Sequence, residues 1–142
     1  MLSMKQEQAK TKLERFSSGT YVVYFYPKDN TPGCTIESQD FSRLLPDFQK
    51  LGVKVCGVSK DDEQSHNKFT TDCNLTVPLI ADVSGEICEE FGAIGEKTNF
   101  GKTYVGIIRS TFVVKDGVVL KSWKNVQVKE HAQKVLDYVS SL

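Results

Sequence analysis

The feature that most constrains the fold is a run of seven residues, Thr20 to Tyr26, in which every side chain is β-branched or aromatic. Such a composition favours a buried β-strand. A turn-rich loop with the sequence PKDNTPG follows, and then Phe41, Leu44, Leu45 and Phe48 recur at helical spacing. We therefore expect a buried strand that leads through a loop into a helix.

The segments that follow alternate between strand and helix patterns. Pro46 lies inside the first helical pattern, so we expect that helix to break or kink near residues 44–46. An Asp-Gly pair, Asp116-Gly117, joins two β-branched runs within 110–123 and predicts a hairpin. The other expected elements are strands over 53–59 and 77–82 and helices over 62–74, 84–92 and 128–141. This order predicts an α/β fold with a central mixed β-sheet flanked by helices.

Length and charge narrow the class of protein. The chain has 142 residues, which suits one domain, and its 18 basic residues balance 18 acidic ones. Basic residues and aromatics do not cluster together, so we expect no nucleic acid or anionic membrane as a partner. The N-terminus lacks the apolar core of a signal peptide, and no apolar run approaches the roughly 20 residues of a membrane span. We expect a soluble protein that acts on small molecules or other proteins.

The cysteines and histidines indicate the cellular compartment and whether a metal site is to be expected. Four cysteines at irregular spacing fit reduced thiols better than a disulfide framework, which indicates a reducing compartment such as the cytoplasm. They are Cys34, Cys56, Cys73 and Cys88. His66 and His131 lie on expected polar helices, and neither forms a Cys/His pair with zinc-ligand spacing. We expect no metal, no other cofactor and no functional role for these histidines.

Cys34 stands where the first helix is expected to begin. Thr31 is a good N-cap, Pro32 suits the first helical position, and Gly33 leaves room for a group to approach the backbone. A thiol in a first helical turn lies near unpaired N–H groups, which favour its thiolate form. Arg109, one of three arginines, precedes the STFVV run and is a candidate cation for that thiolate. Residue types alone equally allow an inert loop thiol and an exposed arginine.

The spacing of these residues resembles a known family. Pro27, Thr31 and Cys34 form Pro-x-x-x-Thr-x-x-Cys, and with Glu37 and Arg109 they resemble the active site of the peroxiredoxins, in the bacterioferritin-comigratory or peroxiredoxin Q branch. The likeness continues through GVKVCGVSKDD, VPLIADVSGE and YVGIIRSTFVVKDG. It implies a thioredoxin-like peroxiredoxin domain over 20–142, preceded by a partly helical segment, 1–19. That segment is short for the branch, which commonly opens with a β-hairpin.

The resemblance implies a thiol-dependent peroxidase without a cofactor. Cys34 would attack hydrogen peroxide or an alkyl hydroperoxide and become a sulfenic acid, and thioredoxin or a small thiol would recycle it. A monomer or weak dimer is expected. Thr31 would hydrogen-bond thiolate and peroxide, and Arg109 would hold their negative charge. Further implied roles are orientation of peroxide by the N–H groups of Gly33 and Cys34, shielding by Pro27, and orientation of Arg109 by Glu37.

The partner that would reduce the sulfenic acid is less well defined. Many members carry a second cysteine five residues after the first, where this chain has Gln39, and others one helix later, near Thr70. The leading hypothesis is one working cysteine reduced by an external thiol, with Cys73 as the best internal candidate and Cys88 a weaker one.

Two other functions compete with that of a peroxidase. A disulfide oxidoreductase of the thioredoxin type needs Cys-x-x-Cys, and the chain has Cys34-Thr35-Ile36-Glu37. A peroxide-sensing signalling protein would use the same cysteine and the same first step, so the sequence leaves it open.

Overall fold

The structure is a computed structural model that describes residues 14–142. Most of the partly helical segment expected over 1–19 therefore lies outside the described residues. Its described part contains a short 3-10 turn, η1 (Glu14–Phe16). Phe16 is buried and its ring meets Tyr21 and Phe91 edge to face, so this part of the segment packs on the body of the protein. A boundary after residue 19 stays a prediction.

The central sheet is mixed, as predicted. Its order is β3-β2-β1-β6-β7, in which β2 runs parallel to the central strand β1 and β6 runs antiparallel to it. The side chains of Val22 to Phe25 are completely buried, which explains the composition of this strand. The five strands are β1 (Thr20–Phe25), β2 (Val53–Ser59), β3 (Leu79–Ala81), β6 (Ser110–Lys115) and β7 (Val118–Lys124).

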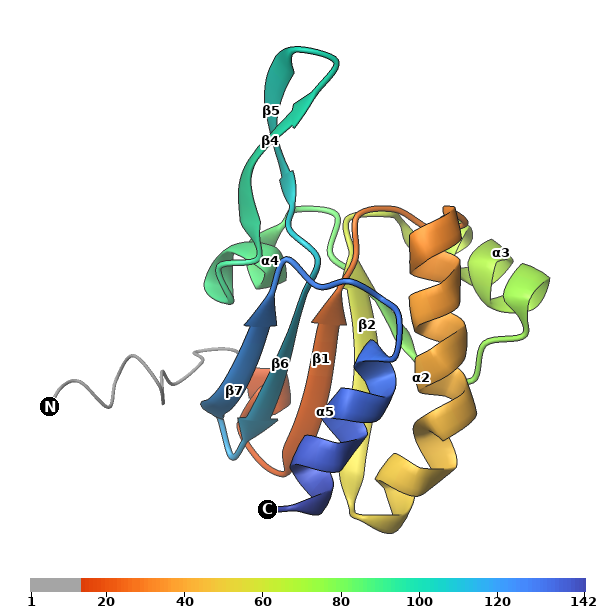
Figure 1. Cartoon of the computed structure of the whole chain (residues 1–142), viewed down its shortest axis with the longest axis vertical. Coiled ribbons are helices and arrows are strands. Elements are labelled where there is room, and N and C mark those ends of the chain that lie inside the picture. Colours follow the sequence, from red (N-terminus) through yellow and green to blue (C-terminus); the bar gives the residue numbers. More distant parts are fainter. Residues whose placement is uncertain (1–13) are drawn as a thin grey trace, which may run out of the picture.

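Helices cover both faces of this sheet. Figure 1 shows α2 (Pro32–Lys50) and α5 (His131–Ser140) in front of the strands, with α3 (Glu63–Cys73) beyond α2. Val22 and Tyr24 belong to the apolar core on the α2 face. Val23 and Phe25 belong to a second core, which includes residues of α4 (Glu86–Glu90). The alternation of β1 side chains thus supplies two cores from one strand.

Of the break or kink expected near Pro46, the structure shows no break. Helix α2 runs through Pro46 without interruption, although its last turns bend away from the axis of the first turns in Figure 1. A proline lacks the N–H that would bond the carbonyl four residues earlier. That carbonyl belongs to Ser42, and it accepts the Thr76 hydroxyl at 3.2 Å instead. Burial of Leu44, Leu45 and Phe48 holds the helical face in place.

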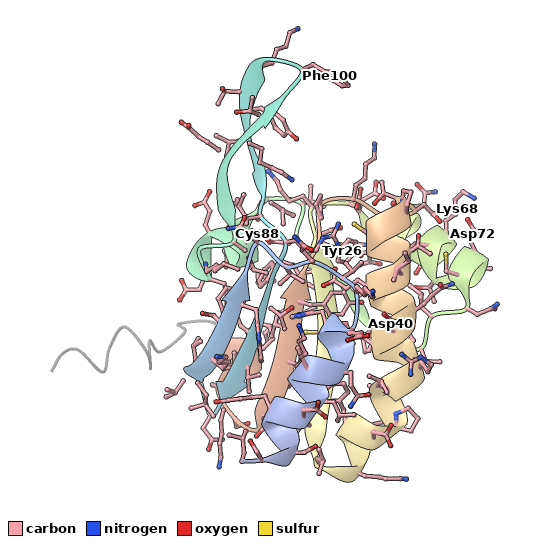
Figure 2. The ribbon with its side chains drawn as sticks, viewed as in Figure 1. Tyr26, Asp40, Lys68, Asp72, Cys88 and Phe100 are labelled. Atoms are coloured by element: carbon pink, nitrogen blue, oxygen red, sulfur yellow. The ribbon has the colours of Figure 1, made fainter. Side chains whose placement is uncertain are left out.

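The sequence patterns missed a second, two-stranded sheet. Strands β4 (Ile94–Asn99) and β5 (Lys102–Ile107) form a hairpin that projects away from the body in Figure 1. Its turn consists of Phe100 and Gly101, which both have positive φ. Phe100 lies at the tip (Figure 2) with 95% of its surface exposed. An aromatic at a left-handed turn position is unusual, so Phe-Gly does not signal a hairpin as Asn-Gly does.

The other expected elements are confirmed with small changes at their ends. Asp62 caps α3 by accepting a hydrogen bond from Ser65 N at 2.9 Å. The turn between β6 and β7 is Asp116-Gly117, both with positive φ, as the Asp-Gly signal predicts.

Gly57 allows β2 to pack beside β1, and its replacement gives a test of this packing. It pairs with Tyr24 in the sheet, and a Cβ there would lie 2.6 Å from Tyr24 Cζ and 3.0 Å from Leu79 Cδ2. The Tyr24 ring is fixed, because it stacks on Phe41 at 4.5 Å. We predict that Gly57→Ala lowers the free energy of unfolding by about 1–3 kcal/mol, measured by urea denaturation. The exposed Lys54→Ala on the same strand should change it by less than about 0.5 kcal/mol.

Candidate active site

Cys34 lies in the first turn of α2, directly after the loop that follows β1. The residue at the N-cap of α2 is Thr31, and Pro32 is the first helical residue, as the sequence predicts. Thr35 N donates to Thr31 O at 2.8 Å, which closes the first turn around Cys34. The Cys34 side chain is completely buried. A thiol in this position is shielded from bulk water and faces a helix N-terminus.

Arg109 reaches Cys34 from the link between β5 and β6. One guanidinium nitrogen, Nη2, donates to Cys34 Sγ at 3.4 Å, and the other, Nη1, donates to Glu37 Oε1 at 2.7 Å. The planar guanidinium fork therefore spans the thiol and a carboxylate one helical turn further along α2. The structure thus brings Arg109 to two residues that lie 72 and 75 positions earlier in the sequence.

Gly33 makes this approach possible. A Cβ at Gly33 would lie 3.1 Å from Arg109 Nη2 and 3.7 Å from Arg109 Cζ. The absence of a side chain thus lets the guanidinium lie against the first turn of α2. This is the close approach that the sequence predicted for Gly33, with an arginine as the approaching group.

Glu37 is almost fully buried beneath Arg109, with 1% of its surface exposed. Burial raises the pKa of Glu37 to about 7, although the positive charge of Arg109 opposes this shift. Its second oxygen, Oε2, has no hydrogen-bond partner within residues 14–142. Burial also disfavours the charge on Arg109, but the negative charges of Glu37 and Cys34 outweigh it and raise the Arg109 pKa. Arg109 therefore stays charged at the thiol.

Thr31 and Pro27 lie in the loop before the helix. The Thr31 hydroxyl donates to Lys28 O at 2.8 Å, so its hydrogen is committed to the loop and it does not cap α2. In this state Thr31 can accept a hydrogen bond from a bound peroxide, but it cannot also donate one to the Cys34 thiolate. Pro27 is half-buried in the same loop.

Two of the remaining cysteines lie far from this site. Cys56 and Cys88 belong to the core on the α4 face of the sheet, whereas Cys34 belongs to the core on the α2 face. Figure 2 labels Cys88, which belongs to α4. Burial raises the pKa of Cys56 to about 12. Burial and the neighbouring Asp82 raise that of Cys88 as well. Cys56 is thus the inert core residue that we expected, and Cys88 is a poor thiol nucleophile.

Cys73 has a different environment. It is half-buried at the end of α3, and its Sγ lies 3.8 Å from Asn30 Oδ1 in the loop that precedes Cys34. Gln39 Nε2, on α2, donates to the Cys73 carbonyl at 3.5 Å. The end of α3 therefore touches both the loop and the helix that hold the candidate site.

Both histidines lie on helices, as expected, but their side chains are buried and do not lie on a polar face. His131 Nε2 and Thr111 Oγ1 are 2.8 Å apart, and burial lowers the His131 pKa to about 4. His131 is therefore a neutral core residue. His66 instead forms an ion pair with Asp29, at the centre of the loop before Cys34. The sequence reasoning missed this pair.

Residues 14–142 contain no cluster of three or more histidine, cysteine or acidic side chains arranged to hold a metal ion. Within the same range, no helix is long and apolar enough to cross a membrane.

Comparison with known proteins decides the family. The AhpC/TSA family model matches residues 2–122. The chain belongs to this family. A putative peroxiredoxin bcp of Helicobacter pylori is 50% identical over 117 residues, which are 82% of this chain and 77% of that protein. Peroxiredoxin Bcp of Bacillus subtilis is 39% identical over 143 residues, covering 99% of this chain and 91% of that protein.

Solved structures show to which branch of the family this peroxiredoxin belongs. Peroxiredoxin Q of Xanthomonas campestris is 43% identical, with a TM-score of 0.84 over 89% of this chain and 82% of that one. A structure from work on the alkyl peroxide reduction activity of the Xanthomonas campestris bacterioferritin comigratory protein matches equally well. The predicted family branch and thioredoxin-like fold are thus confirmed. The chain is a thiol-dependent peroxidase, and the comparisons do not favour the peroxide-sensing alternative.

The guanidinium of Arg109 gives a direct test of the site. In Arg109→Lys a single ammonium replaces the fork, so it cannot hold Cys34 and Glu37 in the same geometry. Loss of one charged hydrogen bond, about 1.5–3 kcal/mol, should slow the reaction with hydrogen peroxide roughly ten- to hundredfold in stopped-flow measurements. Arg43→Lys makes the same change at an exposed position of α2 and should leave the rate as it is. Parent-like kinetics in Arg109→Lys would exclude the guanidinium from the site.

Proposed function

We propose that this peroxiredoxin reduces hydrogen peroxide and alkyl hydroperoxides through a sulfenic acid formed at Cys34. The observation that carries the proposal is the contact of 3.4 Å between Arg109 Nη2 and Cys34 Sγ in the first turn of α2. A charged donor that points at a buried sulfur stabilises negative charge where the reaction needs it.

The residues around Cys34 support each part of this reaction. The Cys34 thiolate attacks one peroxide oxygen, and an S–O bond forms as the O–O bond breaks. Sulfur loses two electrons, each of the two peroxide oxygens gains one, and the attacked oxygen stays on sulfur as the sulfenic acid. The leaving hydroxide or alkoxide takes a proton from solvent water and departs as water or alcohol. Arg109 stabilises its developing charge, and the hydroxyl oxygen of Thr31 accepts the hydrogen of the bound peroxide. The backbone N–H groups of Gly33 and Cys34, unpaired in the first helical turn, orient the peroxide.

The loop and the buried carboxylate complete the proposed site. Glu37 orients Arg109 through the hydrogen bond of 2.7 Å to Nη1. Pro27, half-buried in the loop that precedes Cys34, shields the thiolate from water.

An external thiol completes the cycle in this proposal. One thiol condenses with the sulfenic acid and releases water, and a second thiol reduces the resulting mixed disulfide and restores Cys34. Thioredoxin or a small thiol fits this role, because Cys56 and Cys88 lie in the core on the α4 face of the sheet. All four cysteines are free thiols, which suits the reducing cytoplasm. A monomer or weak dimer stays a prediction.

Replacement of the sulfur nucleophile tests the assignment to Cys34. We predict that Cys34→Ser abolishes peroxide consumption and leaves the fold intact, because a serine hydroxyl is not ionised at neutral pH. Peroxide consumption and circular dichroism measure the two outcomes. Cys73→Ser is the control, and it should consume the first equivalent of peroxide as fast as the parent. Consumption at the parent rate in Cys34→Ser would assign the reaction to another residue.

The fate of oxidised Cys34 separates external from internal reduction. A disulfide needs two Cα atoms within about 7 Å. Cys73 Sγ contacts Asn30 and Cys34 Sγ contacts Arg109, and we expect that α3 must loosen before the two sulfurs can be joined. We predict that one equivalent of peroxide gives a trappable sulfenic acid, which excess peroxide converts to sulfinic acid. Intact mass and non-reducing peptide mapping measure both products. A peptide linking Cys34 and Cys73 within one turnover would make Cys73 the resolving cysteine.

A further inference from the structure

The loop that leads from β1 to Cys34 is tied to α3 by one buried carboxylate. The side chain of Asp29, in the middle of this loop, is 3% exposed. Its oxygens accept hydrogen bonds from Tyr26 OH at 2.7 Å, Ser65 Oγ at 2.7 Å and His66 Nδ1 at 2.8 Å. Two of these three donors belong to the first turns of α3. The position of the loop therefore depends on contacts with a helix that is distant in sequence.

The geometry assigns a positive charge to His66. Its Nδ1 faces the Asp29 carboxylate, and its Nε2 lies 3.0 Å from Ile80 O, in β3. A carboxylate and a carbonyl only accept hydrogen bonds, so both ring nitrogens must donate and the ring is an imidazolium. Burial disfavours this charge, but Asp29 outweighs the burial and raises the His66 pKa above its ordinary value. In the same way, the donors around Asp29 outweigh its burial and lower its pKa.

The backbone of the loop is held at the same point. Asp29 N donates to Asp61 Oδ2 at 2.8 Å, and the same oxygen accepts the Ser59 hydroxyl at 2.7 Å. One residue later, Asn30 has a left-handed backbone and contacts Cys73 at the far end of α3. The first turn of α3 thus contacts Asp29 and its last residue contacts Asn30. These two consecutive loop residues lie five and four positions before Cys34.

We propose that His66 is a positioning residue of the peroxidase site, and that its buried ion pair with Asp29 fixes the loop that places Thr31 and the first turn of α2 around Cys34. This inference rests on Cys34 as the residue that reacts with peroxide. Removal of one partner from a buried pair leaves an uncompensated charge. Without His66, the loop must shift to bring Asp29 to water, and small shifts of positioned groups slow catalysis strongly.

The pair also sets a pH range for this fixation. Besides Asp29, the groups around His66 are the charged side chains Asp61, Glu63 and Arg15 and the neutral phenol of Tyr26, whose pKa burial raises. His66 has a raised pKa, so its contribution is complete below its ordinary value of 6.5 and is lost as pH rises through its value in the folded protein. Asp29 has a lowered pKa, so its contribution is complete above its ordinary value of 3.8 and is lost at lower pH.

The central experiment compares parent and His66→Gln in stopped-flow reactions with hydrogen peroxide across pH. Glutamine retains one donor but carries no charge. We expect the variant to react roughly 10- to 100-fold more slowly below pH 6.5, and the ratio of parent to variant rate to shrink as pH rises and His66 loses its proton. Dividing one rate by the other removes the pH dependence that comes from groups present in both proteins. A ratio that is near one, or independent of pH, would overturn the proposal.

Further variants separate positioning from simple loss of stability. In the double variant Asp29→Asn/His66→Gln, two neutral amides can pair, so its loss of rate should be smaller than the product of the single losses. Ser65→Ala removes one hydrogen bond from Asp29 but keeps the ion pair, so it should fold even if His66→Gln does not, and slow the reaction several-fold. A parent-like rate in Ser65→Ala would show that the reaction does not depend on how firmly Asp29 is held, and multiplicative losses in the double variant would show that Asp29 and His66 act independently. Either outcome would count against the proposed positioning role.

Two controls complete the design. Lys68→Gln removes a charge from the exposed face of α3, where Lys68 pairs with Asp72 at 2.9 Å (Figure 2), and it should react like the parent. Cys34→Ser, measured in parallel, separates a failure of the proposed function from a failure of the positioning role alone. A Cys34→Ser protein that still consumed peroxide would overturn the proposed function itself. An inactive Cys34→Ser beside a fully active His66→Gln would overturn the positioning role alone.

Discussion

The site depends on a single guanidinium that is shared between a buried carboxylate and a thiol. Glu37 has lost nearly all contact with water, and Arg109 is the cation that compensates for this burial. The same cation contacts Cys34, so the interaction that makes Glu37 tolerable inside the protein also fixes the charge at the sulfur. Gly33 provides the space, because a side chain there would press on Arg109. Packing and chemistry therefore constrain the same four residues.

The residues of the site that the sequence predicted best are those that lie close together in the chain, at the start of α2. Thr31, Gly33, Cys34 and Glu37 lie within two turns at the start of α2, so their spacing fixes their geometry once the helix forms. Arg109 was found only because an arginine precedes a core strand and because the family motif includes it. His66 gave no local signal. Its role depends on Asp29, 37 positions earlier, and only the packing of α3 against the loop brings the two together.

The same division applies to the fold. Buried strands can be predicted from their β-branched and aromatic composition, and β1 is the clearest case. The β4–β5 hairpin is exposed along much of its length, so burial places little constraint on its side chains and its turn uses an unusual Phe100-Gly101 pair. Pro46 predicted a break or a kink, and the helix bends without breaking. The rule behind that prediction counts the hydrogen bond that proline removes, but it cannot see that Thr76 donates to the freed carbonyl of Ser42.

Two carboxylates flank Cys34 in sequence, and they titrate differently because burial and hydrogen bonding are balanced differently at each. At Asp29 the hydrogen bonds from three side chains outweigh burial and lower the pKa, whereas at Glu37 burial outweighs Arg109 and raises the pKa to about 7. The pair of Glu37 with Arg109 is thus complete only above about pH 7. The pair of Asp29 with His66 weakens as pH rises above the raised pKa of His66. A rise in pH therefore strengthens the hold of Glu37 on the guanidinium while it weakens the hold of His66 on the loop.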